Sequence, residues 1–368
     1  MATLEEIARL AKVSRSTVSR VINNKPRVSA NTRERVWSII HQTDFHPNVA
    51  ARTLASRRSH IIGLVMIQPY NVVTSEPFSA ELVQHIAATC EETGYHLMLS
   101  LVSTSKPNTY GQIVRGGYLD GLIVYYACTD DSFVSRLQRE KVPFVLIGHS
   151  PQADGIFTAD MDNSTGAEAM ARHLAGLGYT RIATVTGPAF AMSSRDRLEG
   201  FLKGLQACGL ECPDRYIQEG DFTEGSAFLA MQHLLSQDPQ PEAVFVANDT
   251  MAVGAIRAAR MAHLRVPEDI AITGFDDTPM AQISEPPLTT VHQSSELLGR
   301  KAVEMLIGQL EPDRREGVVK QNVVLPVDLV VRESCGARLR LASREVKRSV
   351  KEVNQTERNP FTYCSRTR

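Results

Sequence analysis

The sequence has few features of secreted, membrane or metal-binding proteins. Six cysteines are spread over 368 residues with no C-x-x-C pair and no histidine at zinc-site spacing, so neither a disulfide scaffold nor a metal site is indicated. No apolar run approaches the ~18 residues that a membrane span needs, and the N-terminus lacks a basic segment followed by an apolar one. We therefore expect a cytoplasmic protein with reduced thiols and no membrane insertion.

Motifs of common enzyme classes are also missing. The chain has no G-x-S-x-G elbow, no phosphate-binding Walker loop, no H-E-x-x-H and no G-x-G-x-x-G after a predicted strand. Ten histidines are scattered, and the adjacent carboxylates of Asp276 and Asp277 would point in different directions, unlike the facing pair of a glycoside hydrolase. We expect no catalytic residues and no cofactor.

Charge is distributed unevenly along the chain. The formal net charge is only −1, but residues 1–60 carry 11 Lys and Arg against 4 Asp and Glu, and residues 61–335 carry 20 against 34. Residues 336–368 are basic again. A basic segment joined to an acidic body is expected where one module meets a polyanion such as DNA. Solvated surface charge alone can produce the same bias, so the motifs must decide.

The first 43 residues predict three short helices. Apolar residues recur at helical spacing in each of them. Two short helices joined by a tight turn, with arginine and hydroxyl side chains on the outer face of the second, define a helix-turn-helix. A three-helix bundle with a solvated polar face is the alternative. Each helix follows a hydroxyl side chain that can cap it: Thr3 before residues 4–11, Ser14 before residues 15–23 and Ser29 before residues 30–43.

The segment 49–55 follows this bundle and amounts to about two helical turns, too few for a stable isolated helix in water. A close approach to DNA would supply the missing stabilisation. Small Ala51 and Ala55 could then lie against the floor of the minor groove, with Leu54 as an apolar wedge between base steps.

Residues 61–335 alternate β-rich runs with amphipathic stretches, which predicts parallel βαβ sheets covered by helices on both faces. The predicted fold class is therefore α/β, doubly wound, preceded by an all-α domain. The expected strands are residues 61–67, 96–102, 121–126, 144–148, 181–187, 243–248 and 270–275, with a short run at 289–291.

Polar side chains follow several of these predicted strands, where ligands of open parallel sheets collect. One guanidinium, carboxylate and amide acceptors and an aromatic face suit the hydroxyls of a sugar, each of which donates and accepts hydrogen bonds. Ordinary loops are also polar, and that alternative holds for each residue taken singly. The residues are His149 after Gly148, Arg197, Phe222, Asn248, Asp276 and Gln293.

Three N-terminal runs resemble the start of the lactose-repressor/galactose-repressor (LacI/GalR) family of transcription regulators: TLEEIARLAKVSRSTVSRVINN, RVSANTRERV and FHPNVAARTLASRRSHIIGLV. The resemblance continues to about Cys335. It implies base contacts in the major groove by Arg15, Ser16 and Arg20, with Arg27 in a nearby loop. It implies phosphate contacts by Thr3, Ser14, Thr17, Asn23, Ser29, Thr32 and Asn48. Ala51, Leu54 and Ala55 match hinge-helix residues that enter the minor groove.

The runs RLEGF (197–201), VANDTMAVGA (246–255) and TGFDDTPMAQISEPPLTTV (273–291) resemble the core motifs of the same family. They imply a periplasmic-binding-protein-like effector domain of two subdomains crossed by three strands. Gly148 stands where many sugar-responding members have an aspartate, which leaves the sugar open. The implied effector contacts are Arg197, Phe222, Asn248, Asp276 and Gln293, with Phe78, Tyr125, His149 and Ser193 at the rim.

The resulting domain scheme has four parts. We expect a DNA-binding headpiece over residues 1–45, a hinge helix and linker over 46–60, an effector and dimerisation domain over 61–335, and a basic tail over 336–368. The first subdomain would contain about 61–160 and 290–322, and the second about 161–289 and 323–335. In the tail, Leu339, Val346 and Val353 recur at seven-residue spacing, so a disordered tail and a tetramer-forming coiled coil are both kept open.

These features predict a homodimeric repressor of carbohydrate-use genes. Two headpieces would read a pseudo-palindromic operator, and a small sugar or sugar phosphate would release it. A purine corepressor acting with the opposite sign is an alternative. A sugar-binding transport protein is a third, but it would need export and would not need a basic headpiece.

Overall fold

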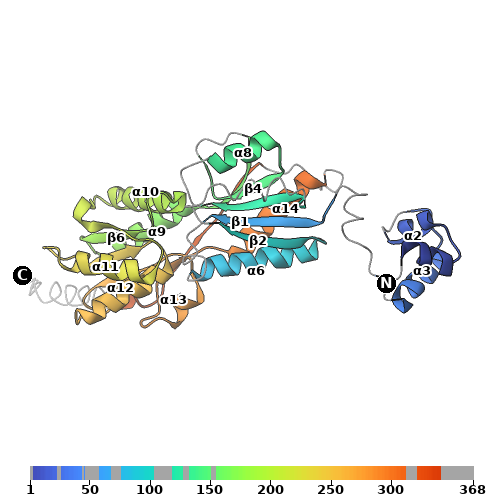
Figure 1. The fold of residues 1–368 in the computed structure, drawn as a ribbon. Coiled ribbons are helices and arrows are strands. Elements are labelled where there is room, and N and C mark those ends of the chain that lie inside the picture. The colour runs from blue at the N-terminus through green and yellow to red at the C-terminus, as the bar shows by residue number, and fades with distance from the viewer. Residues whose placement is uncertain are drawn as a thin grey trace, which may run out of the picture. The chain divides into compact units, whose positions relative to one another are not determined.

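The computed structural model describes residues 3–22, 26–43, 45, 58–67, 76–102, 118–126, 132–150, 155–311 and 321–340. The chain divides into two compact units (Figure 1). The first contains Met1–His60 with Tyr118–Asp120, and the second contains Ile61–Gly117 with Gly121–Arg368. None of the described helices is long and apolar enough to cross a membrane.

The first unit is built on three helices, α1 (Leu4–Leu10), α2 (Arg15–Ile22) and α3 (Ala30–Gln42). Their predicted caps are confirmed: Thr3, Ser14 and Ser29 accept hydrogen bonds from the amides three residues further on, at 3.3, 3.1 and 3.3 Å. Such caps satisfy backbone N–H groups that have no partner inside the helix. A small core closes the unit, and its buried side chains are Ile7, Ala8, Ala11, Val18, Val21, Val36 and Ile40.

The second unit has two lobes. The first lobe contains a parallel sheet in the order β11 (Asn322–Leu325), β5 (Phe157–Met161), β4 (Phe144–Ile147), β3 (Gly121–Tyr126), β1 (Ile61–Ile67) and β2 (His96–Val102). Helices α6 (Pro77–Glu92) and α14 (Ser295–Leu310) pack against each other and share the buried core of this sheet. Helix α8 (Ser132–Glu140) belongs to the same lobe.

The second lobe contains a parallel sheet in the order β7 (Ile217–Glu219), β6 (Ile182–Thr186), β8 (Ala243–Val246) and β9 (Ala271–Thr273). Helices α9 (Asn163–Gly176) and α10 (Met192–Ala207) cover one face, and α11 (Glu224–Leu235) and α12 (Asp249–Met261) cover the other (Figure 1). Two separate apolar clusters, one on each face, bury this sheet. The predicted doubly wound α/β architecture is confirmed.

Short segments connect the lobes. The chain leaves the first lobe between β5 and α9, returns through β10 (Thr290–His292) into α14, and leaves again between β11 and β12 (Asp328–Val330). Strands β10 and β12 pair antiparallel. Helix α13 (Pro279–Ile283) precedes the first of them, and a short 3-10 helix, Asp214–Tyr216, precedes β7.

One predicted boundary is wrong. We placed the end of the first subdomain at residue 322, but that residue begins β11, which pairs with β5 in the first-lobe sheet through Leu325. Strand β11 lies at the edge of the sheet, and its side chains alternate between exposed and half-buried. Its apolar pattern is therefore weaker than that of a central strand. The boundary at residue 160 similarly falls inside β5.

Candidate functional site: an interlobe cleft and a helix-turn-helix

A cleft of about 650 Å³, counted out to its open mouth, lies between the two lobes. The carboxyl ends of strands from both lobes supply its walls, as the topology requires. Its lining residues are Glu76, Phe78, Tyr125, Ile147, Gly148, Asp160, Met161, Asn163, Met192, Ser193, Arg197, Phe222, Asp276, Gln293 and Leu298.

Arg197 is fixed at the base of this cleft and is only 6% exposed. Its Nε donates to Asn163 Oδ1 at 2.8 Å, and its Nη1 donates to the carbonyl of Ala247 and lies 3.3 Å from Asp276 Oδ1. The guanidinium carbon stacks 3.7 Å from the ring centre of Phe275. These contacts hold the long, flexible side chain of Arg197 in one orientation. A ligand would therefore bind a guanidinium that is already in place.

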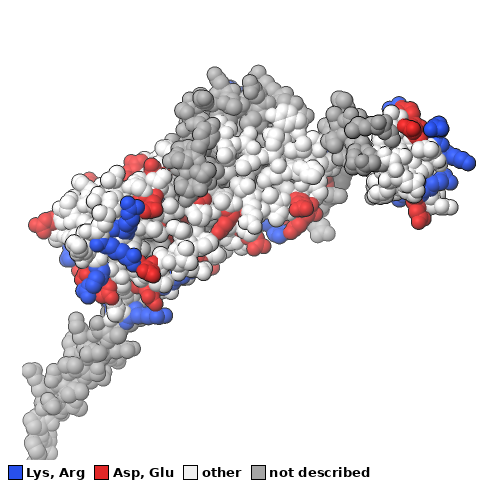
Figure 2. Space-filling model, turned by 60° about the horizontal axis from the view of Figure 1, so that its bottom comes forward, with Lys and Arg blue, Asp and Glu red and all other residues white. Residues whose placement is uncertain are grey.

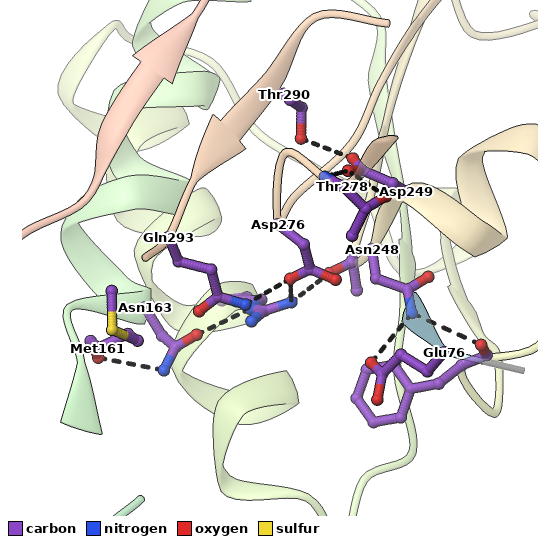
Figure 3. Close-up of polar contacts among 12 residues, drawn as sticks. Glu76, Met161, Asn163, Asn248, Asp249, Asp276, Thr278, Thr290 and Gln293 are labelled. Carbon is purple, nitrogen blue, oxygen red and sulfur yellow. Dashed lines mark hydrogen bonds and ion pairs between the residues drawn. The ribbon is translucent and has the colours of Figure 1, made fainter. Parts of the chain in front are cut away.

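Asp276 is the partner of Arg197 and is also buried. Figure 3 shows Gln293 pointing toward it, with Gln293 Nε2 donating to Asp276 Oδ1. Burial raises the pKa of Asp276, Arg197 opposes this shift, and the nearby Glu76 and Asp249 carboxyls raise the pKa further. Its backbone is in the left-handed region at φ 113°. Its amide donates to the Val291 carbonyl at 2.8 Å, which holds this strained residue beside the interlobe strand β10.

Glu76 brings a second buried carboxyl to the cleft from the first lobe. Its Oε2 accepts from Ser79 Oγ at 2.6 Å, and its Oε1 accepts from Asn248 Nδ2 of the second lobe at 3.4 Å. Burial raises the pKa of Glu76, while Ser79 and Arg197 lower it. Sequence analysis missed this residue, because it follows no predicted strand and belongs to none of the recognised motifs.

Two predicted effector contacts lie beside the cleft instead of lining it. Asn248 is fully buried, where it caps α12 by accepting from the Met251 amide at 2.8 Å and bridges to Glu76. His149 Nδ1 lies 2.7 Å from Asp160 Oδ2 and 3.7 Å from Asp196 Oδ2. The ligand-type atoms of these three residues lie within 4.8 Å of one another. The other predicted contacts line the cleft: Phe78, Tyr125, Ser193, Arg197, Phe222, Asp276 and Gln293.

The buried carboxylate of Asp249 lies near Asp276 and binds two threonines. It accepts from Thr290 Oγ1 at 2.6 Å and from the amide and hydroxyl of Thr278 at 2.8 and 3.2 Å (Figure 3). Burial raises its pKa to about 7. Asp249 therefore joins α12 to β10, the strand that leads between the lobes.

The first unit presents the second helix of its helix-turn-helix to solvent. Arg15, Ser16 and Arg20 are exposed on α2, as predicted, and Arg27 is exposed in the loop before α3. Lys and Arg side chains gather along one edge of this unit in Figure 2. Arg15 Nη1 lies 3.1 Å from Glu5 Oε1, and both side chains of this ion pair are exposed.

The predicted phosphate contacts divide into two groups. Thr3, Ser14, Thr17, Ser29 and Thr32 lie at the starts of the helices, where their hydroxyls and amides take part in the caps. Helix starts are suited to anions because backbone N–H groups and the helix dipole point toward them. Asn23, Asn48, Ala51, Leu54, Ala55 and the tail beyond residue 340 lie outside the described residues.

A helix-turn-helix unit joined to two parallel-sheet lobes around a polar cleft defines a DNA-binding regulator with a small-molecule site. Residues 3–48 match the bacterial regulatory proteins of the lacI family, and residues 171–335 match a periplasmic-binding-protein-like domain. The chain belongs to the LacI family of bacterial transcription regulators.

Similar proteins over most of the chain are named as transcription regulators. The regulator CelR of Thermobifida fusca is 36% identical over 335 residues, 90% of this chain and 98% of that protein. The ribose operon repressor of Escherichia coli K12 is 38% identical over 316 residues, 84% of this chain and 93% of that protein. The repressor PurR of Edwardsiella ictaluri is 33% identical over 338 residues, which is 91% of this chain and 97% of that protein.

Two regulator complexes are among the solved structures that share the fold. A complex of CelR with cellobiose has a TM-score of 0.70 at 34% identity, covering 91% of this chain and 100% of that one. The lac repressor dimer bound to operator and the anti-inducer ONPF has a TM-score of 0.80 at 31% identity, covering 91% and 99%.

Proposed function

We propose that this protein is a cytoplasmic, homodimeric, non-catalytic repressor that leaves its operator when a small neutral sugar binds in the interlobe cleft. The observation that carries the proposal is the buried cluster of Arg197, Asp276 and Gln293 at the base of the cleft. Fixed donors and acceptors of this kind pair with hydroxyls that both donate and accept. Phe222 adds an aromatic face for the apolar side of a pyranose or furanose ring.

The charge of the cleft favours a neutral sugar over a sugar phosphate. Three acidic side chains, Glu76, Asp160 and Asp276, line it. Arg197 is the one Lys or Arg among the described lining residues, and its Nε and Nη1 already bond to the protein. A phosphate would have to be desolvated beside three acidic side chains, with Arg197, already paired with Asp276, as its cation among the described lining residues, which is costly.

The named ligands of relatives support the same effector class. CelR was solved with cellobiose, and another relative is named for the ribose operon. The lac repressor was solved as a dimer on its operator. We infer for this chain a dimer whose two α2 helices enter successive major grooves, with residues 46–57 as the segment between the DNA-binding unit and the cleft.

A purine corepressor is the second candidate, because PurR is 33% identical over 91% of this chain. A purine would tighten operator binding, whereas an inducing sugar would weaken it. The sign of the effect therefore separates the two functions.

A thermal-shift screen tests the proposal. Cellobiose, D-ribose, other mono- and disaccharides and purine bases are added to the full chain, since a bound effector raises apparent stability by about 2.7 kcal/mol at a hundredfold excess over Kd. Hits are then titrated against an operator selected from random duplexes. A sugar that raises Tm and weakens operator binding supports the proposal; a purine that tightens binding overturns the sugar assignment.

A further inference from the structure

Two of the side-chain contacts that join the lobes link residues far apart in the sequence. One is the buried hydrogen bond between Asn248 and Glu76. The other joins His149 to Asp196 and is partly open to solvent, with side-chain exposures of 39% and 21%. The effector functions assigned above leave this second bridge unexplained.

The second bridge combines residues from three elements. His149 comes two residues after β4, and Asp160 lies in β5, so both belong to the first lobe. Asp196 lies in α10 of the second lobe. The imidazole Nδ1 therefore contacts a carboxylate of its own lobe at 2.7 Å and one of the opposite lobe at 3.7 Å.

We propose that His149 is a positioning residue that holds the two lobes together through Asp196, so that its protonation controls how tightly the cleft is closed. A protonated imidazole lies between two carboxylates and compensates both. A neutral imidazole can still donate from Nδ1 to Asp160, but Asp160 and Asp196 then lack a cation between them and repel each other.

The surroundings of His149 favour its protonated form. The hydrogen bond to Asp160 raises the pKa of His149 above 6.5, burial opposes the shift, and Asp196 raises the pKa further. Burial raises the pKa of Asp196 to about 6. The carboxylates of Asp160 and Glu199 also raise this pKa, whereas His149 and Arg197 lower it. The ion pair thus forms above about pH 6, where Asp196 is ionised, and is lost as pH rises through the pKa of His149.

Lobe separation can be measured without knowing the effector. Spin labels are placed on the full chain at two exposed positions, Arg139→Cys in α8 and Gln206→Cys in α10, with the exposed Cys208 replaced by serine. A chain without the two new cysteines gives the background. We expect the mean label distance to increase as pH rises through the pKa of His149, with a midpoint above pH 6.5 that equals the midpoint of His149 in NMR.

Three variants decide whether the bridge is responsible. His149→Gln is expected to show the longer distance at every pH, because the repulsion between Asp160 and Asp196 is then never compensated. Asp196→Asn removes both the attraction and the repulsion, so it is expected to abolish the pH dependence of the distance and to lower the NMR midpoint of His149. Asp196→Glu is expected to restore part of the pH response. As a matched control, Asp269→Asn removes an ion pair with Arg265 inside the second lobe, 2.9 Å long, and is expected to behave like the unaltered chain.

The inference is overturned if the label distance of the unaltered chain does not change with pH, or if Asp196→Asn leaves the distance and its pH dependence intact. Each measurement is made with and without a chelator, because the same three side chains are donors that divalent metal ions use. A pH response that appears only without the chelator would assign the bridge to a metal ion and also reject the protonation switch. The readout needs no sugar, so a failed effector screen would leave this inference standing.

Discussion

Asp120 binds Ser59 across 61 positions of sequence: its Oδ1 accepts from the Ser59 amide at 2.6 Å and from the Ser59 hydroxyl at 2.8 Å. Its Oδ2 accepts from the His60 amide at 3.0 Å. Ser59 and His60 are the last residues before β1, and Asp120 is the last before β3. One carboxylate therefore anchors the end of the linker.

Asp120→Ala should remove this anchor and destabilise the protein by about 1–3 kcal/mol, because three hydrogen bonds to a charged group are lost. Urea unfolding measures the change. Asp120→Asn keeps one acceptor oxygen, so its stability should lie between that of the unaltered chain and that of Asp120→Ala. If Asp120→Ala unfolds at the same urea concentration as the unaltered chain, the anchor contributes nothing to stability.

Arg20→Ala should weaken binding to the specific operator by about 1–3 kcal/mol and relax the preference at one base pair, since contacts to base edges carry sequence information. Fluorescence anisotropy on the operator and on single-base variants measures both effects. Arg35→Ala, exposed on α3 outside the predicted contacts, is the control. An equal loss on random duplex DNA would show that Arg20 contacts only the backbone.

Asp276→Asn should abolish the effector response while operator affinity without effector stays within about twofold. The substitution removes the charge that orients Arg197 and Gln293 but keeps the shape of the side chain. Operator titrations with and without the best sugar of the screen measure the response, with the exposed Asp328→Asn as control. A normal response in Asp276→Asn would place the sugar elsewhere.

The cysteines should differ strongly in reactivity. Burial raises the pKa of Cys90 to about 11, and burial together with Asp214 raises that of Cys212 to about 12, so both stay protonated near neutral pH. Cys208 is exposed. Because the thiolate is the nucleophile, iodoacetamide at about pH 8 should modify Cys208 and spare the other two. Peptide mass spectrometry measures this, and rapid modification of Cys90 would contradict its burial.

The strands that sequence analysis predicted are those with long apolar runs. Residues 61–67, 96–102 and 121–126 are strands with the predicted bounds. Strand β5, with the sequence FTADM, mixes polar and apolar residues, and the short strand β7, with the sequence IQE, is mostly polar, so neither gave a clear apolar pattern. Helix starts were predictable because Thr3, Ser14 and Ser29 act locally.

The site was predictable where a residue directly follows a strand, as Asp276 nearly does after β9. Glu76 was not, because the tertiary fold brings the start of α6 to the cleft and no local pattern reports it. Asn248 was correctly predicted to follow a strand. Its side chain, however, caps α12 and donates to Glu76 instead of lining the cleft. Sequence position predicts which loops meet, whereas the direction of each side chain depends on packing.

The order of the two lobes along the chain has a consequence for biosynthesis. Helix α14 supplies Leu298, Ala302 and Leu306 to the buried core of the first lobe, yet it is translated after all four strands of the second-lobe sheet. The first lobe therefore leaves the ribosome with part of its apolar core uncovered, and it cannot complete that core until α14 has been synthesised. A nascent chain of this protein should depend on chaperones for longer than its strand content alone would suggest.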